Sequence, residues 1–192
     1  MIDDYLKALA SGPEVGLDQV LASREARASW QEKCLNQHPK GSLIALKLNI
    51  VGPVKNNDLI AKIFALAQAD LEASLQAAGL TYQSTAMADL ETGPEAFYLV
   101  NAAGNQVKKL TMELENQLPL ARLYDLDVLV NHAGQVQALS RQDFGQSARS
   151  CLVCGQDAKA CGRSRKHDLS IIRQAMVKLI EKDGRLANVE TN

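Results

Sequence analysis

Aromatic residues are scarce in this chain, and neither sign of charge is in clear excess. Phe, Trp and Tyr make up 4% of the 192 residues, and the formal net charge is −1. Surfaces that bind nucleic acid usually combine a basic stripe with aromatic side chains on which bases stack. The composition therefore argues against a nucleic-acid partner, and any anionic substrate would have to be held by a local group of cations.

Long apolar runs are also missing, and none approaches the roughly 20 residues needed to cross a bilayer. The start of the chain, Met1-Ile2-Asp3-Asp4-Tyr5, has acids where a secretory signal would have bases. The sequence has no internal repeat, low-complexity tract or Pro/Gly-rich linker. We therefore expect a cytoplasmic protein with no membrane partner, folded as a single domain over residues 1–192.

Hydrophobic residues make up 46% of the chain, enough to build a core, and their spacing predicts both helices and strands. The clearest helical stripe lies between Asn57, a suitable N-cap, and Gly79, a suitable stop. Residues Ser42 to Val51 alternate in hydrophobicity like a half-exposed strand. The mixed order of elements favours an α+β fold, a mostly antiparallel sheet packed with helices. We expect further helices at 3–10, 17–37, 107–118 and 168–184, and further strands at 80–87, 95–101, 122–130 and 135–140.

Two aspartates stand out in the expected strand at 122–130. Alternation puts Asp125 and Asp127 on one face, roughly 7 Å apart, where both could bind Mg²⁺ or Mn²⁺ together with phosphate oxygens. Two charges on a solvent-facing strand would give the same pattern. Of the two acids on the preceding helix, Glu113 and Glu115, only one can point toward the pair, and we prefer Glu115 as a third metal ligand.

Three of the four cysteines cluster in a C-terminal loop that leads into the last helix. With a histidine they form the pattern C-x2-C-x6-C-x5-H, which is close to the spacing of structural zinc sites. A redox pair, an iron–sulfur ligand set and thiols without metal remain alternatives. Cys34 stands apart and is expected in the core. The candidate zinc ligands are Cys151, Cys154, Cys161 and His167.

Three groups of residues are candidates for binding phosphate. The turn Gly52-Pro53-Val54-Lys55 lies between a strand and a helix, so its amides could receive an anion, although on sequence alone a plain connecting turn is the better explanation. Arg24 and Arg27, one helical turn apart, could form a fork or a solvent-facing stripe. Arg163 and Arg165 could clamp phosphate or form a solvated charge run.

Several segments together resemble a known enzyme family. They are SREARASWQ, the GPVK turn, MELENQLPLARLYDLDVL, SRQDF and CLVCGQDAKACGRSRKH, in this order from about Leu17 to the last helix. The family is the apo-citrate lyase phosphoribosyl-dephospho-CoA transferase, also called the holo-acyl-carrier-protein synthase of citrate lyase. One departure is Ala121, which stands where the family usually has glycine.

The resemblance implies an enzyme with nucleotidyltransferase-type chemistry. It would move the phosphoribosyl-dephospho-CoA group from triphosphoribosyl-dephospho-CoA to a serine of the acyl carrier subunit of citrate lyase, releasing diphosphate. Asp125 and Asp127 match the D-x-D motif of the family and would hold Mg²⁺, while Arg122 and Lys55 would stabilise phosphate charge. A non-catalytic, zinc-stabilised module that binds a carrier protein is the alternative.

Overall fold

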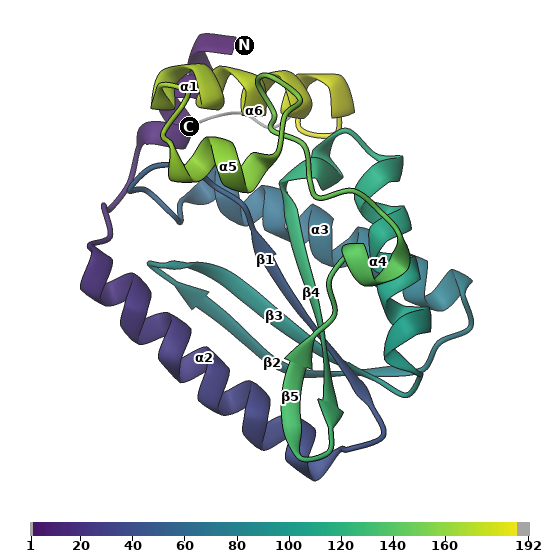
Figure 1. Cartoon of the computed structure of the whole chain (residues 1–192). Coiled ribbons are helices and arrows are strands. Elements are labelled where there is room, and N and C mark those ends of the chain that lie inside the picture. Colours follow the sequence, from purple (N-terminus) through teal and green to yellow (C-terminus); the bar gives the residue numbers. More distant parts are fainter. Residues whose placement is uncertain (1, 188–192) are drawn as a thin grey trace.

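The computed structural model describes residues 2–187, which form helices around one antiparallel sheet (Figure 1). This confirms the expected α+β class. Within that range, no helix combines the length and the apolar character that crossing a membrane requires. The elements are α1 (Ile2–Ala10), α2 (Leu17–Gln37), β1 (Ser42–Leu48), α3 (Asp58–Ala77), β2 (Tyr82–Leu90), β3 (Gly93–Val100), α4 (Gly104–Gln117), η1 (Leu120–Leu123), β4 (Tyr124–His132), β5 (Gln135–Ala138), η2 (Gln142–Phe144), α5 (Ala158–Arg163) and α6 (Leu169–Asp183).

The sheet has the strand order β2-β3-β1-β4-β5, with every neighbouring pair antiparallel. The central strand β1 therefore pairs with β3 on one side and β4 on the other. In the β1–β4 register, Lys47 lies opposite Asp125 and Ala45 lies opposite Asp127. Opposed residues in an antiparallel pair share one face of the sheet, so this register brings a cation beside the two aspartates.

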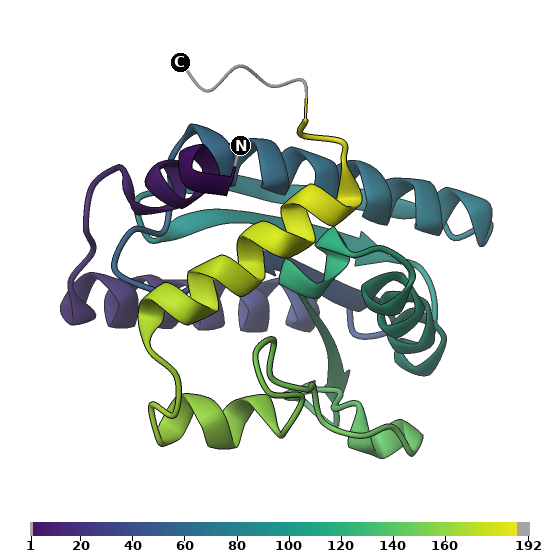
Figure 2. The same ribbon diagram turned by 90° about the horizontal axis from the view of Figure 1, so that it is seen from above.

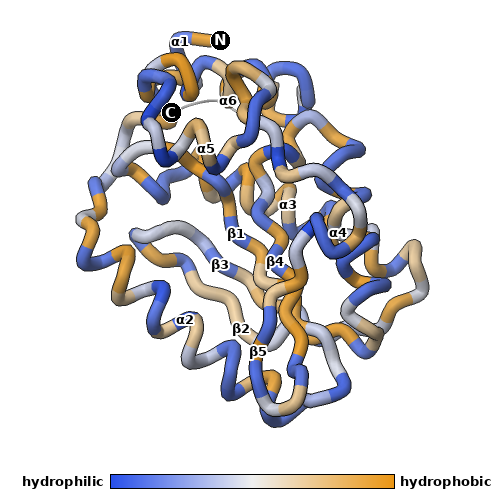
Figure 3. The backbone as a smooth tube through the Cα atoms, in the orientation of Figure 1, coloured by the Kyte–Doolittle hydropathy of each residue, from blue (hydrophilic) through white to orange (hydrophobic). Residues whose placement is uncertain are grey.

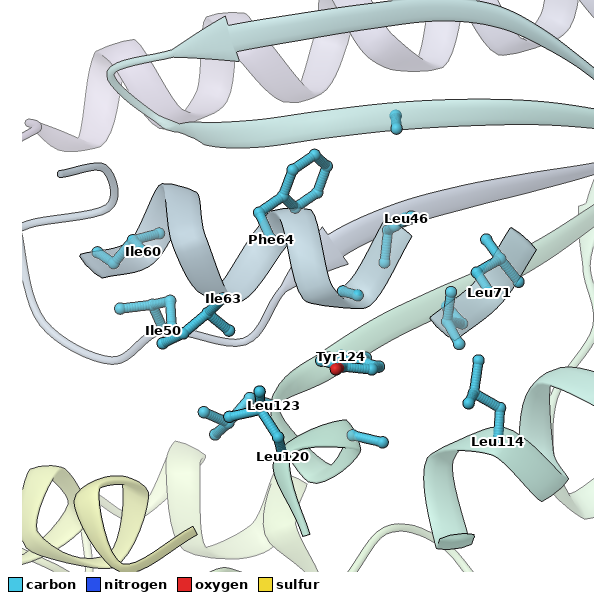
Figure 4. Packing of buried hydrophobic residues seen from close by; sticks show 14 of the residues in the cluster. Leu46, Ile50, Ile60, Ile63, Phe64, Leu71, Leu114, Leu120, Leu123 and Tyr124 are labelled. Carbon is cyan, nitrogen blue, oxygen red and sulfur yellow. The ribbon is translucent and has the colours of Figure 1, made fainter. Parts of the chain in front are cut away.

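One face of the sheet, here called the α3 face, carries the larger hydrophobic core. Helix α3 packs on this side, and α2 lies on the opposite side (Figure 2). Asn57 caps α3 by accepting a hydrogen bond from the backbone of Ile60 at 2.9 Å. Tyr124 of β4 donates to Asp70 of α3 at 2.6 Å, which links strand and helix. Figure 4 shows part of this core, which includes Ile44, Leu46, Ile63, Leu71, Leu114, Leu123, Leu126 and Val128.

The other face, here called the α2 face, has a much smaller apolar cluster. Trp30 of α2 packs against Phe97 of β3, with ring centroids 4.6 Å apart. Cys34 is buried in this cluster, as expected from the sequence. Many residues of α2 are hydrophilic (Figure 3), so α2 cannot seal this face along its whole length. The incomplete cover leaves space for a site.

The structure corrects one expected boundary that matters for the site. The strand predicted from residue 122 begins at Tyr124, because a 3-10 turn, η1, occupies Leu120–Leu123. That turn follows Pro119, whose carbonyl accepts a hydrogen bond from the backbone of Arg122 at 3.3 Å. Arg122 therefore lies outside β4. Helix α5, capped by Asp157, was not expected from the sequence.

Candidate functional site

Asp125 and Asp127 lie on the α2 face of β4, where both meet the same lysine. The ammonium group of Lys47 is 2.9 Å from a carboxylate oxygen of each aspartate. The predicted sharing of one face is therefore present in the structure. Their side chains keep 40% and 48% of their exposure, so both carboxylates remain accessible to an incoming ligand.

The charges of this group are mutually dependent. Burial acts to raise the pKa of Asp125, but the charge of Lys47 and its hydrogen bond lower it below the ordinary value. Burial acts to lower the pKa of Lys47, but the two aspartates raise it above the ordinary value. Both partners are thus ionised at neutral pH. The Asp125 carboxylate is therefore in the form that binds a metal cation.

A cavity of about 190 Å³ opens beside Asp125, between α2, the end of β1 and the start of β3. Its walls combine four cations with two carboxylates. The cations suit a strongly anionic ligand, and a carboxylate could bind a metal ion that accompanies such a ligand. The structure brings together here several of the residues singled out from the sequence. The charged lining residues are Arg24, Arg27, Lys47, Lys55, Glu95 and Asp125.

Besides Lys47, two more of these cations already have partners. Arg27 forms an ion pair with the buried Glu95 of β3, so it does not form a simple fork with Arg24. Lys55 donates to the carbonyl of Ile50 at 2.6 Å, and burial lowers its pKa. Both interactions hold the cations in place at the cavity wall before any ligand arrives, which reduces the entropy lost on binding.

An apolar groove of about 610 Å³ adjoins the cavity along α2 and the β2–β3 hairpin. The two spaces share part of their lining, including Ser23 and Thr92, which hydrogen-bond to each other at 3.1 Å. One extended ligand could therefore occupy both. The apolar lining of the groove consists of Ala22, Ala26, Trp30, Ala86, Ala88, Leu90 and Phe97.

Glu115, preferred from the sequence as a third metal ligand, is buried in a different group of charges. It forms ion pairs with Arg141, at 2.8 Å, and with Arg149. Burial raises its pKa, against the lowering effect of the two arginines. In the described part of the chain, the carboxylate oxygen of Glu115 does not converge with those of Asp125 and Asp127 as a set of metal ligands would. The structure therefore does not support the third-ligand prediction, because two arginines already satisfy this carboxylate.

Other predicted phosphate-binding residues lie away from the cavity. Arg122 donates to the carbonyl and hydroxyl oxygens of Ser150, at 2.7 and 3.2 Å. Gly52 has a φ of +98°, which favours glycine, and a β-carbon there would meet the Arg173 guanidinium at 2.8 Å. Arg163 and Arg165 are exposed near α5. Among the described residues, none of these four predicted phosphate ligands lines the cavity that contains Asp125.

The three thiols and one imidazole predicted as zinc ligands in the C-terminal loop do lie close together. One ligand atom from each lies within 4.8 Å of every other, so this Cys/His cluster, Cys151, Cys154, Cys161 and His167, could hold a metal ion such as zinc. Thiol sulfurs of Cys154 and Cys161 are 3.6 Å apart. That separation is well beyond a disulfide bond, which is about 2.05 Å long. All four cysteines of the chain are free thiols.

Comparison with known proteins adds an independent observation to this geometry. A family model described as apo-citrate lyase phosphoribosyl-dephospho-CoA transferase matches residues 15–183. The chain belongs to this family. The match includes the cationic cavity, the aspartate pair of β4 and the whole Cys/His cluster, so it covers every part of the site described above.

Relatives of the transferase family in three bacteria match most of this chain. A probable apo-citrate lyase phosphoribosyl-dephospho-CoA transferase of Streptococcus pyogenes is 36% identical over 171 residues, covering 88% of each protein. The Escherichia coli transferase is 33% identical over 175 residues, 91% of this chain and 93% of the relative. Protein CitXG of Haemophilus influenzae is 38% identical over 161 residues, 84% of this chain, and the match spans only 34% of that longer protein.

Sequence reasoning missed several charged residues of the site. Lys47 is only one of the polar positions of an alternating strand, yet the antiparallel register places it opposite Asp125. Glu95 begins an apolar stretch, and no motif or spacing in the sequence marks it as a site residue. Lys108 and Arg149 both lie close enough to lower the pKa of Asp125 by their charge, although they come from α4 and from a loop. Of these, only Lys47 could have been found, by pairing the two alternating strands.

Proposed function

We propose that this chain transfers the phosphoribosyl-dephospho-CoA group from triphosphoribosyl-dephospho-CoA to a serine of the acyl carrier subunit of citrate lyase. The observation that carries the proposal is the cavity beside Asp125, where four cations surround an ionised aspartate. A triphosphate brings several negative charges to one place, and such a lining matches it. The names of the relatives supply the substrate class.

The reaction is a substitution at phosphorus. The serine hydroxyl oxygen of the carrier attacks the phosphorus atom nearest the ribose, a new phosphorus–oxygen bond forms, and the bond to the diphosphate leaving group breaks. The hydroxyl proton passes to a base or to solvent, and diphosphate leaves with the bonding electron pair. Because a phosphorus–oxygen bond forms as diphosphate leaves, the proposed reaction is of the nucleotidyltransferase type.

In this proposal the cations hold the substrate and the leaving group. Arg24, Lys47 and Lys55 neutralise phosphate oxygens, and this charge stabilisation is worth most where negative charge grows on the departing diphosphate. Arg27 is held by Glu95 and orients the wall of the cavity. Arg122 acts at a distance from the cavity, through its contact with Ser150.

The aspartate pair also fits a divalent cation. Both carboxylates are directed at one point, at which the Lys47 ammonium now lies, 2.9 Å from each. Asp125 and Asp127 would hold Mg²⁺ or Mn²⁺ there, with Lys47 turning toward the phosphates. The ion would neutralise triphosphate oxygens and the leaving diphosphate.

The adjoining groove fits the rest of the precursor. Dephospho-CoA carries a long, largely uncharged pantetheine arm, and the groove lined by Trp30 and Phe97 is apolar and continuous with the cationic cavity. A single ligand with a charged end and an apolar arm matches the two spaces together. We place the reaction in the cytoplasm, where citrate lyase would be available as the partner.

The proposal is tested by incubating the chain with apo acyl carrier subunit, triphosphoribosyl-dephospho-CoA and Mg²⁺. We expect the carrier to gain the mass of the phosphoribosyl-dephospho-CoA group, with one diphosphate released per carrier modified. A carrier whose acceptor serine is replaced by alanine should gain nothing. A parallel reaction with an active relative shows that the reagents are competent.

Failure of the chain beside an active relative would overturn the transferase proposal. In that case a non-catalytic module that binds the carrier protein becomes the better explanation. Binding of the apo carrier without any mass gain, measured by calorimetry, would support that second function.

A further inference from the structure

The Cys/His cluster has the dimensions of a tetrahedral metal centre. The sulfurs of Cys154 and Cys161 are 3.6 Å apart, and Nε2 of His167 is 3.3 Å from the sulfur of Cys154. Ligand atoms held at about 2.3 Å (sulfur) and 2.0 Å (nitrogen) from zinc lie roughly 3.5–3.8 Å from one another in a tetrahedron. The four side chains are thus close to the positions that zinc would require.

The segment around this cluster contributes little to the apolar core. Helix α5 has six residues, of which Cys161 alone is buried, and most of the loop before it is exposed. An isolated helix of that length is far below the length that is stable in water. A structural zinc ion supplies folding free energy where the apolar core is missing.

The same loop contributes directly to the surroundings of Asp125. Arg149, two residues before Cys151, donates to the carbonyl of Tyr124 at 2.7 Å and pairs with Glu115. The backbone carbonyl of Arg149 accepts a hydrogen bond from Ala158 of α5 at 2.9 Å. Figure 1 shows the loop passing from β5 back toward the start of β4. Arg149 is therefore fixed at one end by the cluster segment and at the other by β4.

We propose that the Cys/His cluster binds one Zn²⁺ and that this zinc centre is a positioning device for Arg149 beside Asp125. The zinc ion joins the Cys151–Cys154 turn to α5 and to His167, which precedes α6. This fixes the backbone from which the Arg149 guanidinium reaches the start of β4. Zinc binding stands independently, whereas the positioning role rests on the proposed transferase function.

The first experiment measures metal content in the full chain, purified under reducing conditions without chelator. Elemental analysis should find one zinc ion per chain and no iron. The double variant C151A/C154A should contain none. C34A is the matched control, because Cys34 is buried in the small cluster of the α2 face, and this variant should keep one zinc ion. Wild-type chain without zinc, or with iron in its place, would overturn the proposal.

The second experiment separates positioning from a general loss of structure. Zinc is removed from the wild-type chain with a chelator and then restored, and transfer to the carrier is measured at each stage. We expect kcat to fall about tenfold on removal, as for other groups that orient a site indirectly, and to recover with zinc. Circular dichroism should show the sheet retained, since the large core is built without the cluster.

The same removal is then repeated in the variant Arg149→Gln. If zinc acts through Arg149, its removal from R149Q should change kcat by less than about twofold, because coupled groups are not additive. An equal tenfold fall in R149Q would overturn the positioning role and leave a purely structural zinc. If the wild-type chain holds zinc but transfers nothing beside an active relative, the transferase proposal and the positioning role fail together, while the metal site stands.

Discussion

The two faces of the sheet use the same strands for different purposes. On the α3 face, alternate residues such as Leu126 and Val128 join a large apolar core. On the α2 face, the intervening residues Asp125 and Asp127 meet Lys47 beside a cationic cavity. One strand therefore supplies stability from one set of side chains and chemistry from the other, since strand side chains alternate between faces.

The difference between the two faces shows that the site lies where α2 packs incompletely against the sheet. Helix α2 packs on its face through a small cluster around Trp30 and Phe97, and near Lys47 it leaves a cavity between itself and the sheet. Substitutions on the α2 face should therefore change transfer more than stability. Substitutions on the α3 face should do the reverse.

The largest effect on activity is expected for Asp127→Asn. The carboxylate that would hold the metal is lost while the shape of the side chain is kept, so kcat should fall by about 10²–10³, with the melting temperature nearly unchanged. Carrier mass gain and thermal unfolding measure the two effects. Asp18→Asn, at an exposed position in the first turn of α2, is the matched control and should be neutral. A large loss of stability in D127N with normal transfer would contradict the assignment of transfer chemistry to the α2 face.

The largest effect on stability is expected for Leu71→Ala. Leu71 is fully buried on the α3 face, and loss of its side chain leaves a cavity, so the free energy of unfolding should fall by about 2–5 kcal/mol. Urea unfolding measures the loss, and kcat per folded molecule should stay close to wild type. Leu17→Ala, at a side chain that is 72% exposed, should change stability by less than about 0.5 kcal/mol.

A smaller effect on activity is expected for Arg24→Gln. The guanidinium lines the cavity, and loss of one charged contact to phosphate should raise KM for the precursor about tenfold, with a smaller change in kcat. Steady-state kinetics at fixed carrier concentration gives both values. Lys33→Gln removes a cation from an exposed position on the same helix and should leave KM unchanged. An equal rise in KM in K33Q would mean that the net charge of α2, rather than the cavity, attracts the substrate.

The smallest effect is a pH dependence tested with Lys47→Met. Because Lys47 lowers the pKa of Asp125, their pairing stabilises the fold above the ordinary carboxyl pKa, and this contribution is lost as the pH falls through the lowered value. The difference in unfolding free energy between wild type and K47M should be largest near pH 7, at most about 1 kcal/mol for such exposed partners, and shrink below about pH 4. Urea unfolding from pH 3 to 7 measures it, and a difference independent of pH would contradict the pairing.

Much of the fold follows from local sequence patterns. The helix expected between Asn57 and Gly79 is α3, because a strong apolar stripe and both end signals agree. The strand boundary at Tyr124 could not be predicted, since no proline, glycine or capping residue separates Leu123, which lies in a 3-10 turn, from the strand that follows. Helix α5 was missed because six residues are too few for a periodic pattern.

The site was predictable where its residues share an element. Alternation alone placed Asp125 and Asp127 together, and the spacing of the Cys/His cluster predicted its convergence. Residues from different elements were not predictable, because their meeting depends on tertiary packing. Glu115 illustrates this, as its arginine partners come from segments 26 and 34 residues further along the chain. Ala121, discussed above as a departure from the family, is fully buried in the core and lines no part of the cavity.

The most direct test is a crystal structure of the D127N chain with triphosphoribosyl-dephospho-CoA and Mg²⁺. We expect the triphosphate in the cavity lined by Arg24, Lys47 and Lys55, with the apolar arm along Trp30 in the groove of the α2 face. A triphosphate bound instead at Arg163 and Arg165, with the cavity of the α2 face empty, would contradict the assignment of the site.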